Sequence, residues 1–253
     1  MSIITLTTDF GTRDWFVGSL KGVILGVNPE VTIVDIAHEI PAGDVRAGAF
    51  ALLASYRCFP RSTVHVAIVD PGVGSHRAAI GVRTADYVFV GPDNGVLSFA
   101  LGREKVVEIR RLDNDEYFRK PVCNTFHGRD VFAPVAVRLT QNIPFGSLGE
   151  RLTDYVRLDW PQPRQDGGRI RGEIVYIDHF GNAITNIELA DKGVSRLCVP
   201  DKLACEAREF YQATPGGQAL TLVGSSGFLE IAVNGGNAAR MFALTLGDVV
   251  EVW

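Results

Sequence analysis

The sequence predicts an α/β protein in two parts: an N-terminal α/β domain with a central, mostly parallel sheet, and a smaller C-terminal all-β domain resembling a barrel. Three observations predict this class. Strand-like and helix-like runs alternate from the first residues onward. PQPRQDGG, which follows Trp160, is the richest segment in proline, glycine and polar residues. Short β-like runs with glycine turns come after it. We therefore expect domains at 1–160 and 171–253, joined by a linker at 161–170.

The N-terminal half opens with a βαβ pattern. An apolar run at residues 3–8 predicts a strand, and the amphipathic stretch at 15–27 predicts a helix that Asn28 and Pro29 end. A second strand is expected at 31–36. Together the three elements predict a parallel pair of strands joined by a helix.

The alternation continues along the next sixty residues. A helix with Asp44 as its N-cap is expected to run to Pro60. The β-branched run TVHVAIV at 63–69 predicts a strand that is buried on both faces of a sheet. Further strands are expected at 79–83 and 87–90.

One more helix and the C-terminal strands complete the expected elements. The helix begins near Gly128 and contains Pro134, which predicts a kink. Beyond the linker, five runs have β-like composition: 171–177, 183–187, 219–223, 228–233 and 249–253. Their number and short length favour a small barrel or sandwich.

Composition excludes several classes of function. The net charge is −4 and no Lys/Arg-rich run occurs, which argues against a nucleic-acid partner. The N-terminus has no basic region before its apolar residues, and no apolar run approaches the ~18 residues of a membrane span. Four cysteines without C-x-x-C spacing are typical of a reducing compartment, so we expect a cytoplasmic protein without membrane contact. The histidines lack ligand-like spacing, so no metal site is expected.

The first candidate site is TTDFGTRD, residues 7–14. Asp9 follows the first expected strand, and a carboxylate at that position can accept two hydrogen bonds from a vicinal diol such as a ribose. The stretch has neither G-x-G-x-x-G nor a Walker A pattern, which argues against a dinucleotide or a triphosphate. The alternative is structural: Asp14 caps the following helix and Asp9 supports the turn.

The second candidate is VDPGVGSHR, residues 69–77. Asp70 stands at the carboxyl end of the buried strand, the edge at which open α/β sheets bind ligands. The alternative is that Asp70, Pro71 and Gly72 only form a tight turn.

The third candidate is TFHGRD, residues 125–130. His127 stands before a helix and is a possible proton acceptor, because an imidazole titrates near neutral pH. The alternative is a histidine that only makes structural hydrogen bonds.

Two further candidates lie in the C-terminal half. In IDHFGNAITN, Asp178 and Asn182 flank a Phe-Gly corner and offer a carboxylate, an amide and an aromatic face. In VGSSGFLEIAVNGGNAAR, residues 223–240, two strands with glycine and serine corners could surround a small ligand. Turn and hairpin formation explain both stretches equally well.

Six motifs together resemble one family. TDFGT…D, VDPGVGS.R, GPDNG, TFHGRD, DHFGN..TN and GSSGFLEIA.N occur in the order and spacing of the S-adenosyl-L-methionine hydroxide adenosyltransferases, a sister group of the fluorinase and chlorinase. The resemblance covers nearly the whole chain. It implies a two-domain homotrimer that converts S-adenosyl-L-methionine and water to adenosine and L-methionine, without a cofactor. It also implies inter-subunit sites, each built by the N-terminal domain of one subunit and the C-terminal domain of the next.

The resemblance also implies roles for individual residues. Asp70, Arg77 and His127 correspond to a catalytic set that positions and activates the attacking water. The implied substrate contacts are Asp9 to both ribose hydroxyls, Asp14 and Asp178 to the methionine ammonium, Ser225 to the methionine carboxylate, Asn182 to the polar edge of adenine, Phe180 and Phe210 as aromatic walls, Phe126 beside the histidine, and Asn234 and Gly235 through backbone contacts to adenine.

The chemistry explains the choice of residues. Attack on the ribose C5′ expels a neutral thioether, so the leaving group needs no acid, whereas water must lose a proton as it attacks. The residues alone leave open which of the catalytic set touches the water. Gly128 stands where halogenases carry a hydroxyl-bearing pocket, Asp70 stands where they have a tyrosine or similar residue, and the fluorinase insertion between Val82 and Tyr87 is missing. These departures favour water over halide.

Three alternative functions remain open from the sequence. A halogenase-like adenosyltransferase would share the S-adenosyl-L-methionine contacts. A non-catalytic protein that binds S-adenosyl-L-methionine or adenosine would not need Asp70, Arg77 and His127 together. A nucleoside hydrolase would need more carboxylates than the N-terminal half offers.

Overall fold

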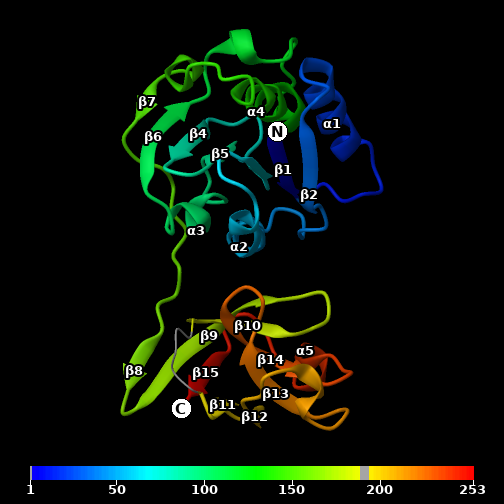
Figure 1. Cartoon of the computed structure of the whole chain (residues 1–253), viewed down its shortest axis with the longest axis vertical. Coiled ribbons are helices and arrows are strands. Elements are labelled where there is room, and N and C mark those ends of the chain that lie inside the picture. Colours follow the sequence, from blue (N-terminus) through cyan, green and yellow to red (C-terminus); the bar gives the residue numbers. More distant parts are fainter. Residues whose placement is uncertain (1, 189–193) are drawn as a thin grey trace. The chain divides into compact units, whose positions relative to one another are not determined.

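The structure is a computed structural model that describes residues 2–188 and 194–253. The chain divides into two compact units, Met1–Leu158 and Asp159–Trp253 (Figure 1). Each unit has its own hydrophobic core, and each is described by itself below.

The N-terminal unit contains a seven-stranded mixed sheet in the order β2-β1-β3-β5-β4-β6-β7. Pairing is parallel from β2 through β1 and β3 to β5, and antiparallel from β5 through β4 and β6 to β7. The predicted fold class is confirmed, although half of the strand pairs are antiparallel. The bounds are β1 Ile3–Thr8, β2 Thr32–Ala37, β3 Val64–Ile68, β4 Ala79–Thr84, β5 Val88–Pro92, β6 Val106–Arg111 and β7 Arg151–Leu152.

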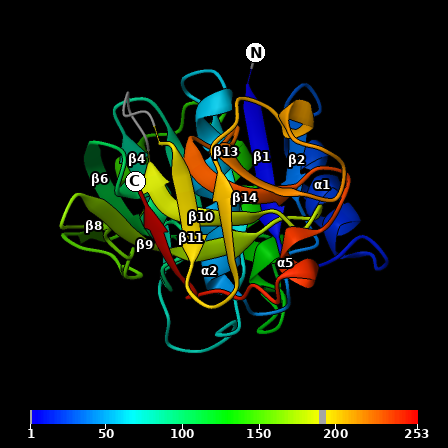
Figure 2. The same cartoon turned by 90° about the horizontal axis from the view of Figure 1, so that it is seen from below.

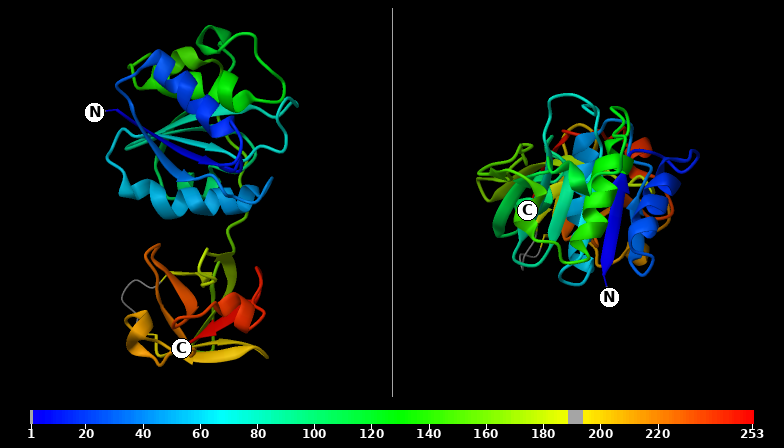
Figure 3. Two further views of the ribbon diagram at one scale, coloured as in Figure 1. Left: turned by 90° about the vertical axis from the view of Figure 1, so that its right-hand side faces the viewer. Right: turned by 90° about the horizontal axis from the view of Figure 1, so that it is seen from above.

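Helices cover both faces of this sheet. The left panel of Figure 3 shows α1 and α4 on one face and α2 on the other. Two separate apolar cores result, one under α1 and α4 and one under α2 and α3. The bounds are α1 Phe16–Val27, α2 Val45–Ser55, α3 Ser98–Leu101 and α4 Ala133–Leu139, with 3₁₀ turns at Tyr56–Cys58, Asp115–Tyr117 and Phe145–Leu148.

Two local signals in the helices have clear outcomes. Asp44 is the N-cap of α2 as expected, because its Oδ1 accepts a hydrogen bond from Ala47 N at 2.9 Å. The kink expected at Pro134 is instead a π turn at Gly128–Phe132 followed by a regular start of α4. Proline lacks an N–H group and fits the first turn of a helix, so the irregularity moves to the preceding turn.

The C-terminal unit is an antiparallel sheet in the order β12-β11-β15-β9-β10-β14-β13, with β8 paired to β9. A bridge between Ala207 and Thr221 links the two ends of that order, so the sheet nearly closes into a barrel. Figure 2 shows its strands in colours from yellow-green (β8 and β9) to red (β15). The bounds are β8 Arg164–Asp166, β9 Arg169–Ile177, β10 Ala183–Glu188, β11 Arg196–Val199, β12 Leu203–Glu206, β13 Ala219–Val223, β14 Phe228–Val233 and β15 Val249–Val252, with α5 Ala238–Met241 and a 3₁₀ turn at Tyr211–Ala213.

The expected linker is largely structured. Its residues from 164 onward form the hairpin of β8 and β9, and Gly167 and Gly168 make the turn with φ of +54° and +84°. Two consecutive positive φ angles suit a tight hairpin turn that glycines adopt without strain. The boundary between the two compact units lies earlier, at Leu158 and Asp159.

No helix in residues 2–188 and 194–253 is long and apolar enough to cross a membrane. The four cysteines are free thiols.

A buried histidine in the sheet predicts how stability changes with pH. His65 in β3 is fully enclosed, and burial lowers its pKa from 6.5 to about 3. Below pH 6.5 the unfolded chain takes up a proton that the folded chain refuses, so stability should fall by about 1.4 kcal/mol per pH unit between pH 6 and 4. Urea unfolding at several pH values measures this slope. His65→Gln, which cannot titrate, should show a slope that is smaller by that amount; equal slopes in both proteins would contradict the assignment.

Candidate functional site

Asp70, Arg77 and His127 form one hydrogen-bonded cluster in the N-terminal unit. Arg77 Nε lies 3.0 Å from both carboxylate oxygens of Asp70, and Arg77 Nη2 also donates to Asp70 Oδ2. The same Nη2 lies 2.9 Å from His127 Nδ1. The side chains of Arg77 and Asp70 are only 10% and 5% exposed, so most of the ion pair is removed from bulk solvent. Arg77 therefore bridges the acid and the imidazole.

The cluster fixes the tautomer of His127. A guanidinium group has donors and no acceptor, so His127 Nδ1 must accept, and the ring proton then lies on Nε2. Burial lowers the pKa of His127 from its usual 6.5, and the charge of Arg77 lowers it further, against the opposing effect of Asp70 and Asp130. The imidazole is thus held neutral near pH 7, with an N–H group as its remaining polar atom.

Glycine allows the two loops of the cluster to meet. Gly74 has φ of +77°, and a Cβ added there would lie 2.3 Å from the backbone oxygen of Asn124. This contact packs the loop that holds Asp70 and Arg77 against the segment that precedes His127. Asp70 also makes the expected turn, because its backbone oxygen accepts from Val73 N at 3.2 Å. Its carboxylate serves Arg77, so the turn and the cluster coexist.

Asp9 lies at the same edge of the sheet as Asp70. The two follow the parallel neighbours β1 and β3, in which Thr8 pairs with Ile68. Asp9 Oδ2 accepts from Gly43 N at 2.8 Å. A Cβ at Gly43 would lie 3.8 Å from the Cβ of Pro71, so the loops that follow three strands converge here. This is the edge at which open α/β sheets bind ligands.

Asp14 and Phe126 differ in what surrounds them. The N-cap of α1 is Trp15 and no side chain caps the helix, so the capping role considered for Asp14 is not observed. Phe126 is only 7% exposed and packs 5.7 Å from Phe10 and 5.2 Å from Phe16, ring to ring. Phe126 is therefore part of an aromatic cluster in the core of the N-terminal unit.

The C-terminal unit contains a pocket of about 400 Å³, lined by Phe180, Asn182, Tyr211, Val233, Gly235 and Gly236. The corner between β9 and β10 supplies Asp178, whose carboxylate accepts from Asn182 N at 2.8 Å and from Asn182 Nδ2 at 2.9 Å. These bonds fix the Asn182 amide. Phe180 is 72% exposed and offers an open aromatic face.

Tyr211 is the pocket residue that sequence reasoning missed. Its hydroxyl donates to Glu230 Oε1 at 2.7 Å, and Glu230 is only 4% exposed. Burial and the nearby Asp178 carboxylate raise the pKa of Glu230, whereas the bond from Tyr211 lowers it. Phe210, the expected aromatic wall, is not among the pocket's lining residues and is 56% exposed. The neighbouring Phe-Tyr pair was the available signal, but the 3₁₀ turn that begins at Tyr211 decides which ring faces the pocket.

Two more expected residues lie on loops of the C-terminal unit. Ser225 is exposed in the corner between β13 and β14. Asn234 is held by three hydrogen bonds: its side-chain amide donates to Thr214 O at 2.7 Å, its backbone N donates to Gln218 O at 3.1 Å, and its backbone O accepts from Gly217 N at 2.8 Å. In the part of the chain that the structure describes, no group of three or more His, Cys, Asp or Glu side chains could hold a metal ion.

Comparisons with known proteins agree on one family. Residues 4–149 match the SAM hydroxide adenosyltransferase N-terminal domain, and residues 172–251 match its C-terminal domain. A protein of Salinispora arenicola named (R)-S-adenosyl-L-methionine hydrolase is 41% identical, covering 98% of this chain and 97% of that protein. A fluorinase of Actinoplanes is 28% identical, covering 99% and 97%. The crystal structure of an uncharacterized conserved protein from Thermotoga maritima superposes with a TM-score of 0.92 at 38% identity, covering 99% of both chains.

Proposed function

Since the chain belongs to the SAM hydroxide adenosyltransferase family, we propose that it hydrolyses S-adenosyl-L-methionine to adenosine and L-methionine. The observation that carries the proposal is Arg77, which bridges Asp70 and His127 at the carboxyl edge of the sheet. Incubation of the purified protein with S-adenosyl-L-methionine, followed by chromatography of adenosine and methionine, tests it. Adenosine and methionine in equal amounts support the proposal, and an unchanged substrate contradicts it.

The reaction is an in-line displacement. A water oxygen forms a bond to the ribose C5′, the bond from C5′ to the sulfonium sulfur breaks, and its electron pair leaves with neutral methionine. The water proton must go to an acceptor, since free water with a pKa of about 15.7 is a poor nucleophile. Holding water and C5′ in line contributes about 7 to 11 kcal/mol in favourable cases.

We propose different tasks for the three residues of the cluster. His127 has its Nδ1 occupied by Arg77 and its proton on Nε2, so it orients the water as a donor and does not accept the proton. The guanidinium of Arg77 stabilises the developing hydroxide charge. Asp70 is the acceptor in the set, because a carboxylate has about four lone-pair sites and Arg77 occupies three.

The remaining contacts follow the family resemblance. We propose that Asp9 binds the ribose hydroxyls, Asp14 and Asp178 the ammonium, and Ser225 the carboxylate. Asn182, Asn234 and Gly235 would contact adenine, whose faces Phe180 covers. Tyr211 takes the place proposed for Phe210, because it lines the pocket. S-adenosyl-L-methionine is the substrate, so the scheme uses no cofactor. The free cysteines support the cytoplasmic location proposed from the sequence.

A halogenase reaction fits this chain less well. The relative named fluorinase is 28% identical, whereas the relatives named hydrolase reach 33% to 41%. The carboxylate of the Asp70–Arg77 pair also offers a hydrogen-bond acceptor that a water molecule can use and a halide ion, which has no proton to donate, cannot.

Asp9 provides a test of the binding assignments. Asp9→Ala should weaken adenosine binding by about 1.5 to 3 kcal/mol, because a charged hydrogen-bond acceptor for the ribose is lost. Asp14→Ala is the matched control. It should lower the affinity for S-adenosyl-L-methionine and leave the affinity for adenosine unchanged, since adenosine has no ammonium group. Calorimetry measures both ligands. Unchanged adenosine affinity in Asp9→Ala would remove Asp9 from the ribose site.

We also propose the homotrimer with inter-subunit sites that the resemblance implies. His127 and Asp178 belong to different units of the chain. If a site takes its two units from different subunits, mixed trimers of His127→Ala and Asp178→Ala chains contain some sites without either defect. Activity should then reappear after subunit exchange, whereas each variant alone stays inactive. Sites built within one chain would always keep one defect, and mixing would restore nothing.

A further inference from the structure

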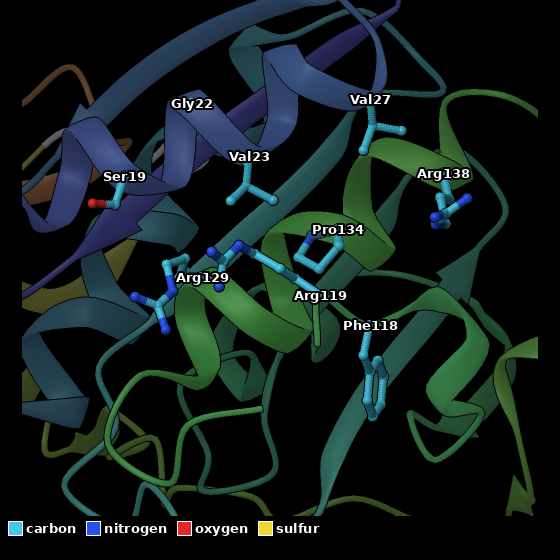
Figure 4. Close-up of a pocket in the computed structure, with 9 residues that line it drawn as sticks. All are labelled: Ser19, Gly22, Val23, Val27, Phe118, Arg119, Arg129, Pro134 and Arg138. Atoms are coloured by element: carbon cyan, nitrogen blue, oxygen red, sulfur yellow. The ribbon is translucent and has the colours of Figure 1, made fainter. Parts of the chain in front are cut away.

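A second cavity lies in the N-terminal unit, between α1, the π turn and α4. Its volume is about 570 Å³, and it is lined by Ser19, Gly22, Val23, Val27, Phe118, Arg119, Arg129, Pro134 and Arg138. The cluster of Asp70, Arg77 and His127 is not part of this lining. Figure 4 shows Arg119 and Arg129 side by side, with Arg138 on the other side of Pro134.

The lining has three cationic side chains and no acidic one. Behind it lies Asp130, whose fully enclosed carboxylate accepts from Arg119 Nη1 at 3.1 Å and from Arg129 Nε at 2.7 Å. Arg138 has no carboxylate partner among the residues that the structure describes, and it lies 5.8 Å over the ring of Tyr117. Three guanidinium groups and one carboxylate leave two positive charges, although the whole chain carries −4.

Asp130 also holds its two arginines in place. Arg129 donates to both carboxylate oxygens, and the backbone N of Cys123 donates to Asp130 Oδ2 at 2.9 Å. A guanidinium that is fixed in this way loses little conformational entropy when it binds a ligand, and its planar set of donors matches a phosphate or a carboxylate. The cavity therefore has preorganised donors for an oxyanion.

The rest of the lining is apolar. Val23 and Val27 from α1, Phe118 and Pro134 present carbon surface beside the arginines. A volume of this size accommodates a small organic molecule, and such sites combine apolar walls with a few polar groups. A phosphomonoester carries about −1.5 to −2 charges at pH 7, close to the two positive charges of the lining.

We propose that this cavity binds a phosphate group, with the three arginines as its ligands, and that the phosphate belongs to a small organic phosphomonoester whose carbon skeleton lies against the apolar wall. The site is separate from the one proposed for S-adenosyl-L-methionine, so it does not depend on that function.

Calorimetry with two probes tests the proposal, using inorganic phosphate and phenyl phosphate at constant ionic strength. Saturating adenosine is present in both titrations to occupy the proposed substrate site. Phenyl phosphate should bind once per chain and more tightly than inorganic phosphate. Equal affinity for the two probes would show that a free phosphate ion is the ligand. It would overturn the proposal that the phosphate belongs to an organic molecule. Binding of neither below roughly 10 mM would overturn the whole proposal.

Two variants locate the binding. Arg138→Gln and Arg119→Gln should each lower the affinity for phenyl phosphate by at least about tenfold, because each removes a charged donor. Arg61→Gln is the matched control: it removes the same charge from an 81% exposed side chain elsewhere in this unit, and should change the affinity less than about twofold. If all three variants weaken binding equally, or if neither Arg138→Gln nor Arg119→Gln weakens it, the site is not this cavity. A further titration without adenosine checks the separation of the two sites: phenyl phosphate that binds only when adenosine is absent would likewise overturn the proposal.

Discussion

Replacement of Arg77 by methionine is expected to lower the rate of S-adenosyl-L-methionine hydrolysis by about 10²- to 10³-fold, the usual loss when one preorganised donor is removed from a developing anion. Adenosine affinity should change little, because Arg77 is proposed to serve the water and not the nucleoside. The variant should also lose about 3 to 5 kcal/mol of stability, since Asp70 stays buried at 5% exposure without its cation. Steady-state kinetics and urea unfolding measure the two effects.

A double variant separates catalysis from stability. Asp70→Asn together with Arg77→Met removes both charges of the ion pair, so most of the lost stability should return. The rate should stay low, because the charge proposed to stabilise hydroxide and the proposed proton acceptor are both absent. Recovery of activity along with stability would mean that the pair is only structural.

Two variants of His127 test whether it donates a hydrogen bond or accepts the proton. His127→Ala should lower the rate by about 10²-fold or more, as expected for a group that acts on the transferred proton or its oxygen. His127→Gln places an amide N–H where the imidazole Nε2–H lies. Its rate should therefore be roughly tenfold higher than that of His127→Ala. If glutamine is as inactive as alanine, His127 is the proton acceptor and the assignment of its tautomer is wrong.

The pH profile gives an independent check on His127. Because burial and Arg77 lower its pKa from 6.5, the neutral form persists as the pH falls, and activity should decline only at a pH below 6.5. In Arg77→Met one of the two causes is absent, so the acidic decline of the residual activity should move to higher pH. An acidic decline centred at 6.5 or above in the unaltered enzyme would contradict this.

Most strands of the N-terminal unit could be predicted because burial on both faces demands continuous apolar, β-branched runs, as in β3. The antiparallel pairing of β5, β4, β6 and β7 was harder to predict from the sequence. Yet the three residues between the expected strands at 79–83 and 87–90 are too few for a parallel crossover, which needs a dozen or more. The strand β6, Val106–Arg111, was missed because its charged residues hide the alternation. The strand β8, Arg164–Asp166, falls within the expected linker because its residues are exposed and polar.

The position of the two acids Asp9 and Asp70 could be predicted for a different reason, whereas the grouping of Asp70 with Arg77 and His127 came from the family resemblance. Asp9 and Asp70 each follow a predicted parallel strand, and the ends of neighbouring parallel strands meet at one edge. The order of the hydrogen bonds, in which Arg77 lies between Asp70 and His127, could not be predicted. It depends on how the loop around Gly74 packs on Asn124. The choice of Tyr211 over Phe210 likewise depends on a single 3₁₀ turn.

Hydrolysis in H₂¹⁸O tests the central claim most directly. If the water that the cluster activates attacks C5′, mass spectrometry should find one ¹⁸O atom in the 5′-hydroxyl of adenosine and none in methionine. In Arg77→Met, the amount of labelled adenosine formed per unit time should fall in parallel with the rate of hydrolysis. Adenosine without the label, label in another product, or no adenosine at all would contradict the account.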